Sequence, residues 1–383
     1  MRIAFVNTDM NVGGIPKASI PMLRELAKHH EVTLILTNGG GEIISEVPDN
    51  VKIKVLISPN FRKQLIYAIM HGRMFSAIKS LVAYKKANNW IDSLYARICL
   101  KEKLKDKYDL AIAYFGMNAK CILTTLECVK ATKRVAFMHG EHPFKKDELQ
   151  VMQRYYTRFD RLFSVSNATK QFYDRDFPEC KRESDVFYNI MDVEGIKAKA
   201  TATVALCENI QCNRSKIHIV TVGRLSPEKG QLMIPDVAER MLSENYDFVW
   251  HIVGGGCDYE KLETLIKDKS LEGRVVLYGN TLNPYPYIRA ADIYVQPSYT
   301  EGYCLTIIEA AILGLPIVAT KVGGTWEHFE DGNTIILCQP TVNSLFDAIT
   351  PLINNESTRK QLSANVSMRD WSNLSEIHKL ENL

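Results

Sequence analysis

Short runs of β-branched and aromatic residues alternate along the chain with longer segments whose apolar residues recur at helical spacing. This alternation is typical of βαβ units that build a parallel sheet. In the first half, the runs that predict strands are 2–8, 31–37, 51–57, 109–115, 134–139 and 161–166. In the second half they are 217–222, 248–253, 275–278, 292–296, 316–319 and 334–337. Two such six-strand series predict an α/β protein with two Rossmann-like domains.

The boundary between the two series lies in residues 193–215, which have weak periodicity and a middle rich in Ala, Thr, Asn and Cys. Such composition is typical of a linker or a surface excursion. We therefore predict an amino-terminal domain over 1–192 and a carboxyl-terminal domain over 193–366. Beyond them, Trp371, Leu374, Ile377 and Leu380 follow the spacing of an amphipathic helix.

Composition excludes several classes of function. A chain of 383 residues can bury two cores, and its net charge of +3 is too mild to indicate nucleic-acid binding. The nine cysteines include no C-x-x-C pair, so neither a disulfide framework nor a zinc site is indicated. The first apolar run is too short for a signal peptide, and no stretch approaches the ~20 apolar residues of a membrane helix. Residence in the cytoplasm is the expectation.

Residues 61–107 form a long segment without a strand signal, in which apolar residues such as Met70 and Met74 are interleaved with Arg73, Lys85 and other cations. The plain interpretation is one or two solvated helices packed on the sheet. The sharper hypothesis is a surface that binds the acceptor or contacts the inner face of a membrane, because cations flanking an apolar stripe favour anionic headgroups.

Two cations follow the strand predicted at 217–222. The turn Gly223-Arg224-Leu225-Ser226-Pro227-Glu228-Lys229-Gly230 leads into a helix, and ligands of open α/β sheets bind beyond the carboxyl ends of strands. Arg224 and Lys229 could together neutralise a diphosphate leaving group without a metal. Ordinary surface cations in a turn are the structural alternative.

Two carboxylates follow the strand predicted at 292–296. The next helix is predicted to start near Cys304, which places Glu301 in the loop before it and Glu309 in its second turn. An ionised carboxylate accepts hydrogen bonds from sugar and ribose hydroxyls, while amides at the helix start would face phosphate. A helix-start glutamate and a satisfied buried one are the structural alternative.

Several of these motifs, in this order, resemble glycosyltransferase family 4, a retaining family with the GT-B fold. Glu301 and Glu309, with the run 310–320 behind them, resemble its E-x7-E signature, and the turn 223–230 resembles its phosphate-binding turn. Segments 253–256, 290–292 and 323–327 also match the family pattern, whereas the first half of the chain matches less closely.

The resemblance implies two Rossmann-like domains that face each other across a cleft. The amino-terminal domain would bind the acceptor and the carboxyl-terminal domain the nucleotide-sugar donor, with residues 367–383 forming a helix that returns to the first domain. The implied reaction moves a hexose or related sugar, with retention, from a UDP-sugar to a hydroxyl of a saccharide or lipid-linked glycan. Biosynthesis of a surface polysaccharide or glycan is the implied setting.

The resemblance also implies roles for particular residues. Arg224 and Lys229 would hold the diphosphate, Glu309 the ribose, and Glu301 the transferred sugar. His139 resembles the family histidine that approaches that sugar, so the predicted catalytic set is Glu301, His139, Lys229 and Arg224. The predicted donor-binding residues are Gly13, Gly14, Arg224, Lys229, Gly302, Tyr303, Cys304, Leu305, Thr306 and Glu309. Gly13 and Gly14 match the family's glycine-rich loop, whereas Cys304 stands where the family often has glycine.

No cofactor and no metal are expected. Asp174-Arg175-Asp176 spells the D-x-D of metal-dependent transferases, but it lies in a charge-rich helical stretch that favours a solvated surface. A nucleotide-sugar epimerase, a phosphorylase of the same architecture and a non-catalytic sugar-nucleotide-binding protein are the alternative functions. A nicotinamide-dependent oxidoreductase is disfavoured, because neither half shows the full G-x-G-x-x-G fingerprint.

Overall fold

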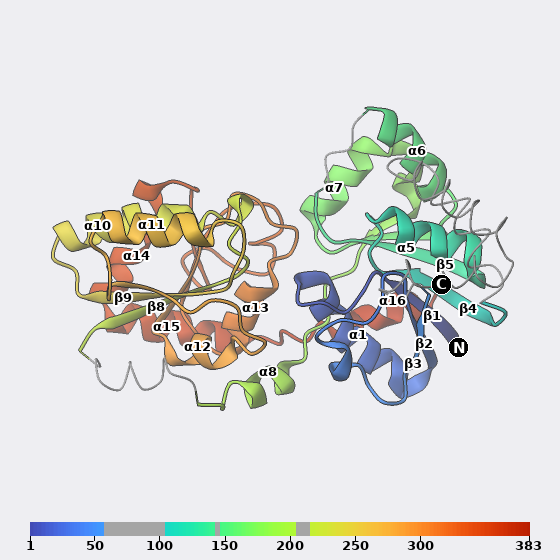
Figure 1. Ribbon diagram of the computed structural model, residues 1–383, viewed down its shortest axis with the longest axis horizontal. Helices are drawn as coiled ribbons and strands as arrows, with labels where there is room; N and C mark the ends of the chain where they lie inside the picture. Colours follow the sequence, from blue (N-terminus) through green and yellow to red (C-terminus); the bar gives the residue numbers. More distant parts are fainter. Residues whose placement is uncertain (57–103, 142–145, 204–214) are drawn as a thin grey trace, which may run out of the picture. The chain divides into compact units, whose positions relative to one another are not determined.

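The computed structural model describes residues 1–56, 104–141, 146–203 and 215–383 (Figure 1). These residues divide into two compact units, Met1–Ile190 with Leu374–Leu383 (unit 1) and Met191–Asn373 (unit 2). Residues 61–103, most of the segment predicted to carry a basic face, lie outside the described residues, as does 204–214 of the predicted linker. No helix in the described ranges is long and apolar enough to cross a membrane.

Unit 1 contains a parallel sheet of seven strands in the order β3-β2-β1-β4-β5-β6-β7. The strands are β1 (Arg2–Asn7), β2 (Glu31–Leu36), β3 (Lys52–Val55), β4 (Lys107–Ala113), β5 (Lys130–Met138), β6 (Arg161–Ser164) and β7 (Ser184–Val186). Six of them correspond to the predicted runs. The prediction of only six was wrong, because β7 is a three-residue edge strand whose sequence Ser-Asp-Val has no apolar run.

The helices of unit 1 connect these strands. They are α1 (Gly14–His29), α5 (Ala119–Leu123), α6 (Lys146–Tyr156) and α7 (Asn167–Asp176), with the short helices η1 (Ile44–Glu46), η2 (Thr124–Cys128) and η3 (Pro178–Glu183). Helix α1 packs against the sheet through an apolar stripe that includes the fully buried Leu23 and Leu26. The side chain of Ser166 caps α7 by accepting the Thr169 N–H at 3.1 Å.

Unit 2 contains a parallel sheet of six strands in the order β10-β9-β8-β11-β12-β13. The strands are β8 (Ile217–Val222), β9 (Phe248–Val253), β10 (Val275–Leu277), β11 (Ile293–Gln296), β12 (Ile317–Thr320) and β13 (Ile336–Cys338). The chain runs outward from β8 in one direction and then resumes at β11 on its other side. The carboxyl ends of β8 and β11 therefore form the topological switch point at which open α/β sheets bind ligands.

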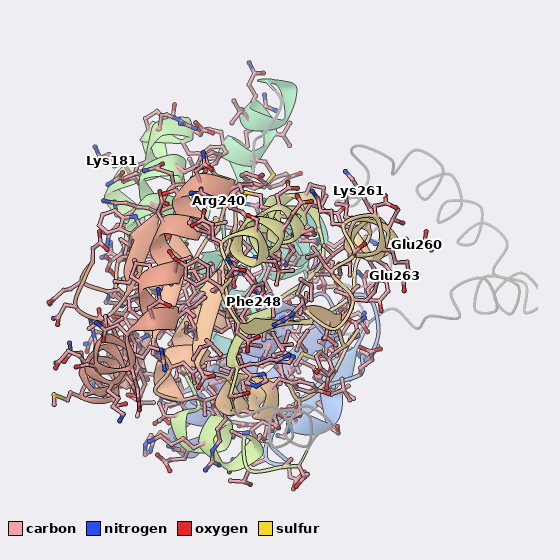
Figure 2. The ribbon with its side chains drawn as sticks, turned by 90° about the vertical axis from the view of Figure 1, so that its left-hand side faces the viewer. Lys181, Arg240, Phe248, Glu260, Lys261 and Glu263 are labelled. Atoms are coloured by element: carbon pink, nitrogen blue, oxygen red, sulfur yellow. The ribbon has the colours of Figure 1, made fainter. Side chains whose placement is uncertain are left out.

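Helices cover both faces of the unit 2 sheet, with α10 and α11 on one side and α12 on the other (Figure 1). They are α8 (Val193–Lys199), η4 (Pro227–Lys229), η5 (Gln231–Met233), α10 (Ile234–Ser243), α11 (Tyr259–Asp268), α12 (Tyr285–Ala290), α13 (Leu305–Ile312), α14 (Val342–Asn354) and α15 (Glu356–Ser367). Alternate strand residues such as Ile219, Trp250 and Val295 pack into a core with α10, α11 and α14. Glu260 and Glu263, on the outer side of α11, extend into solvent (Figure 2).

The last ten residues belong to unit 1. They form η6 (Leu374–Ile377) and α16 (His378–Glu381). The Lys379 ammonium donates to the Val186 carbonyl at 2.7 Å, and the Glu376 carboxylate accepts the Tyr188 N–H at 3.1 Å. The Glu381 carboxylate lies 3.1 Å from the His30 ring nitrogen at the end of α1. The carboxyl-terminal segment is thus bonded to both the first helix and the last strand of unit 1.

Candidate functional site

The loops after β8 and β9 pack backbone against backbone. The Gly223 N–H donates to the Val253 carbonyl and the Leu225 N–H to the Gly255 carbonyl, at 3.0 and 2.9 Å. A Cβ atom on Gly254 would lie 1.9 Å from the Gly223 oxygen, so only glycine allows this approach. The run Val253-Gly254-Gly255-Gly256 thereby supports the turn that carries Arg224.

That turn also packs against the end of β11. Gly230 has a φ of +68°, and a Cβ atom there would lie 2.1 Å from the Pro297 carbonyl oxygen. The Tyr299 N–H donates to the Glu228 carbonyl at 2.8 Å, which joins the turn to the loop that holds Glu301. Arg224, in the same turn, is exposed. The sheet topology thus brings Arg224, Lys229 and Glu301 to one edge, as the motif order predicts.

Lys229 and Glu301 form a direct, two-pronged ion pair. The Lys229 ammonium lies 2.8 Å from Oε1 and 2.7 Å from Oε2 of Glu301, which is 7% exposed. Burial alone would lower the pKa of Lys229, but the negative charge and hydrogen bonds of Glu301 outweigh it and raise that pKa. The sequence motifs predict that both residues bind the donor, and the structure adds that they contact each other.

The loop from Gly302 to Thr306 leads into α13. Cys304 precedes the helix with a φ of +57°, a left-handed conformation in which glycine is the favoured residue. The Ile307 N–H donates to the Cys304 carbonyl at 3.2 Å. The amides of Leu305 and Thr306, the first two residues of α13, precede any intrahelical carbonyl partner, and with the helix dipole they favour an anion. Burial and the nearby Glu301 raise the pKa of the Cys304 thiol, so it stays protonated and is not an activated nucleophile.

Glu309 lies on α13 and is 2% exposed. A buried carboxylate requires hydrogen-bond partners, and the Tyr285 hydroxyl of α12 donates to its Oε1 at 3.3 Å. Tyr285 was missed by the sequence reasoning. Its place 24 residues earlier in the chain gives no periodic or motif signal that links it to Glu309.

The remaining predicted residues lie in unit 1, at the carboxyl edge of its sheet. Gly13 precedes α1 and Gly14 is its first residue, after β1. His139 follows β5, and its Nε2 lies 2.8 Å from the Tyr114 carbonyl oxygen. Because a carbonyl only accepts, Nε2 carries the proton and Nδ1 is an acceptor. Burial lowers the pKa of His139 to about 4, so the ring is neutral near pH 7.

The D-x-D sequence contributes its carboxylates to local ion pairs. Asp174 pairs with Lys170 at 2.5 Å and Asp176 with Arg175 at 2.8 Å, all within α7. Among the described residues, no group of three or more His, Cys, Asp and Glu side chains is arranged to hold a metal ion.

Comparison with known proteins gives the class to which this geometry corresponds. Residues 208–368 match the family described as Glycosyl transferases group 1, and this range contains Arg224, Lys229, Glu301 and Glu309. An uncharacterized glycosyltransferase of Methanocaldococcus jannaschii is 24% identical over 313 residues, which cover 80% of this chain and 79% of that protein.

A second relative is the N-acetylgalactosamine-N,N'-diacetylbacillosaminyl-diphospho-undecaprenol 4-alpha-N-acetylgalactosaminyltransferase of Campylobacter jejuni. It is 26% identical over 207 residues, 54% of each chain. Among solved structures, Anabaena HepE in complex with UDP and glucose has a TM-score of 0.72 at 18% identity, covering 100% of this chain and 98% of its own. A mutant of S. aureus TarM, in complex with fondaparinux, alpha-GlcNAc-glycerol and UDP, has a TM-score of 0.74 at 14% identity, covering 100% and 99%.

These similarities agree with one another. The fold is GT-B, with two parallel-sheet α/β domains. The family match and the named relatives support glycosyltransferase activity, so the chain is assigned as a transferase enzyme.

Proposed function

We propose that this chain is a retaining glycosyltransferase of family 4 that moves a hexose or related sugar from a UDP-sugar to a hydroxyl of a saccharide or lipid-linked glycan. The observation that carries the proposal is the convergence of Arg224, Lys229, Glu301 and Glu309 at the switch point of the unit 2 sheet. Packing of the sheet gives no reason for two cations and two largely buried carboxylates at one edge. Binding of a nucleotide sugar gives each of these charged groups a role.

The donor is held by groups of complementary chemistry. The exposed Arg224 and the first amides of α13 suit the diphosphate, and Glu309, fixed by Tyr285, suits the ribose hydroxyls. The UDP bound in the HepE and TarM structures supports uracil as the base of the donor nucleotide. Resemblance to family 4 supports retention of configuration.

The ion pair gives Lys229 and Glu301 linked tasks. Glu301 holds Lys229 in place, and Lys229 then stabilises the negative charge that builds on the departing diphosphate. The carboxylate accepts hydrogen bonds from hydroxyls of the transferred sugar. In the front-face route of the family, a donor phosphate oxygen takes the acceptor's proton, so the reaction needs no protein base.

Residues of unit 1 also have proposed roles. His139 is neutral near pH 7 and offers Nδ1 as an acceptor for a sugar hydroxyl, and the loop at Gly13 and Gly14 allows close approach of backbone to the donor. We assign acceptor binding to the domain 1–192. The Campylobacter relative is named for a diphospho-undecaprenol acceptor, which supports a lipid-linked acceptor. We propose on this basis that the chain works at the inner face of a membrane.

The direct test is a thermal-shift panel of nucleotide sugars followed by turnover assays on each one that binds. Lys229→Ala should lower kcat by about 10²-fold or more, because it removes a charge aimed at the leaving group, while the protein still binds UDP. Arg289→Ala, which changes a cation on α12 away from this ion pair, is the matched control. Turnover unchanged in Lys229→Ala would contradict the assignment.

The assay also separates the alternatives. A transferase releases UDP in step with acceptor consumption, whereas an epimerase converts the donor without acceptor and a phosphorylase requires inorganic phosphate. EDTA should leave the rate unchanged, because Arg224, Lys229 and helix amides supply the positive charge. Loss of activity in EDTA would contradict the metal-free site.

A further inference from the structure

Gln296, the last residue of β11, is a buried amide at the centre of the switch point. Its side chain is 1% exposed and lies on the sheet face opposite the core that Ile293 and Val295 enter. Its Oε1 accepts hydrogen bonds from the Tyr294 hydroxyl at 2.7 Å and the Thr306 hydroxyl at 3.3 Å. Burial of an amide costs free energy unless its hydrogen-bond partners are present, so these partners fix the position of the Gln296 side chain.

The other end of the amide is directed at Glu301. Nε2 donates to the Ser298 hydroxyl at 2.9 Å and approaches Glu301 Oε1 at 3.4 Å. Ser298 in turn donates to the same Oε1 at 2.7 Å. The orientation of the amide follows from the chemistry, because an ionised carboxylate only accepts and the group that faces it must be the NH₂.

Gln296 therefore joins two parts of one loop. On one side it contacts Glu301 directly and through Ser298, and on the other it contacts Thr306 in the first turn of α13. The Ser298 backbone is itself fixed, since the Thr320 hydroxyl of β12 donates to its carbonyl at 2.5 Å. The rigid strands β11 and β12 thus support both the carboxylate and the helix start.

We propose that Gln296 is a positioning residue that sets the distance between the Glu301 carboxylate and the amides at the start of α13. The inference rests on the proposed function, in which the amides hold the diphosphate and Glu301 the transferred sugar. Gln296 then fixes where the sugar sits relative to its phosphate. Its loss should impair recognition of the sugar and turnover, and should leave binding of the nucleotide alone unchanged.

The experiment compares binding and turnover in matched variants. Gln296→Met keeps the volume and removes the amide, and Ser298→Ala removes the bridging hydroxyl with little change in volume. Thr221→Val is the control, because Thr221 is a fully buried polar residue on the opposite face, where it donates to the Val295 carbonyl at 2.8 Å. Calorimetry measures Kd for UDP, UDP-glucose and UDP-N-acetylglucosamine, and melting curves report folding.

The expected result for Gln296→Met and Ser298→Ala is a UDP affinity within about twofold of the wild type. The ratio of the Kd for UDP to the Kd for the tighter-binding UDP-sugar should fall about tenfold. The kcat should fall about 10- to 100-fold, which is the loss expected when a reacting group is misplaced. Thr221→Val should lower the melting temperature and keep both quantities. The double variant Glu301→Gln, Gln296→Met should have the same UDP-sugar preference as Glu301→Gln alone, because Gln296 acts through Glu301.

Three outcomes would count against the inference. Wild-type UDP-sugar preference and kcat in both Gln296→Met and Ser298→Ala would overturn it. An additive loss in the Glu301→Gln background would show that Gln296 does not act through Glu301. An equal loss in Thr221→Val would show that the effect is general destabilisation. Failure of the wild type to bind UDP or either UDP-sugar would instead overturn the proposed function.

Discussion

Cys304 has a backbone conformation that is unfavourable for a residue with a side chain. Its φ of +57° belongs to the left-handed region, which costs a residue with a Cβ atom about 1–2 kcal/mol, while its side chain is buried. The position directly precedes α13, so the strain lies beside the amides assigned to the diphosphate. Glycosyltransferase family 4, which the sequence resembles, often has glycine at this position, and glycine favours the conformation that the structure shows.

Replacement of Cys304 by glycine and by alanine isolates this strain. Both variants lose the thiol, but only Cys304→Gly removes the Cβ atom. We expect Cys304→Gly to exceed Cys304→Ala in free energy of unfolding by about 1 kcal/mol, measured by urea denaturation. An alanine variant that is as stable as the glycine variant would show that the backbone at this position is unstrained.

The sequence was most informative about residues that belong to a motif. Arg224, Lys229, Glu301 and Glu309 follow strands, and parallel topology brings strand ends together, so their shared edge could be predicted. The Lys229–Glu301 ion pair and the contacts of Tyr285 and Gln296 could not. These depend on side-chain directions between segments far apart in the chain, which spacing does not encode.

At the scale of elements, β8 and β9 are joined by a buried histidine pair. Nδ1 of His218 lies 2.9 Å from Nε2 of His251, the rings are stacked, and Nδ1 of His251 lies 3.2 Å from the Tyr278 hydroxyl. One of the two facing nitrogens must donate and the other accept, so the contact requires that they carry one proton between them. Burial and the neighbouring His218 lower the pKa of His251 to about 3.

This pair should make the protein sensitive to acid. The pKa of His251 in the folded state lies below its unfolded value near 6.5, so its contribution is fully present above pH 6.5 and is lost progressively toward pH 3. At pH 5 the loss should be about 2 kcal/mol. His251→Gln should therefore show a smaller drop in unfolding free energy between pH 7 and pH 5 than the wild type.

The exposed His378 provides the control for this measurement. Its side chain is 72% exposed, so His378→Gln removes a surface histidine and should retain most of the drop in unfolding free energy between pH 7 and pH 5. Parallel pH profiles for His251→Gln and the wild type would contradict the role assigned to the buried pair.

Element prediction succeeded where strands are buried on both faces. The runs 217–222 and 248–253 coincide with β8 and β9, because both are almost continuously apolar and lie at the centre of the sheet. Edge strands were less predictable. β3 is shorter than its predicted run, and β7 has no apolar pattern, since an edge strand of a few residues buries little.

At the scale of the whole molecule, the last ten residues of the chain pack on unit 1. Leu380 is 1% exposed there, whereas Leu374 in the same segment is 45% exposed. We expect Leu380→Ala to destabilise unit 1 by about 2–4 kcal/mol, and Leu374→Ala by less than about 1 kcal/mol. Urea unfolding of both variants measures the difference.

The same variants test whether the UDP part of the donor is held by residues of unit 2. UDP should raise the melting temperature of the Leu380→Ala variant about as much as that of the wild type, because the site residues Arg224, Lys229 and Glu309 lie in Met191–Asn373. Equal destabilisation by the two leucine substitutions would contradict the packing assigned to the terminal segment.

The central claim is that Glu309, on α13 of unit 2, binds the nucleotide of a UDP-sugar. Isothermal titration of UDP into the wild type and Glu309→Ala tests it most directly, with Glu263→Ala, an exposed carboxylate on α11 of unit 2, as a control. The account predicts that UDP binds the wild type and the control alike, and that Glu309→Ala weakens binding at least about tenfold, since hydrogen bonds to a charged group contribute about 1.5–3 kcal/mol. Equal UDP affinity in the wild type and Glu309→Ala would contradict it.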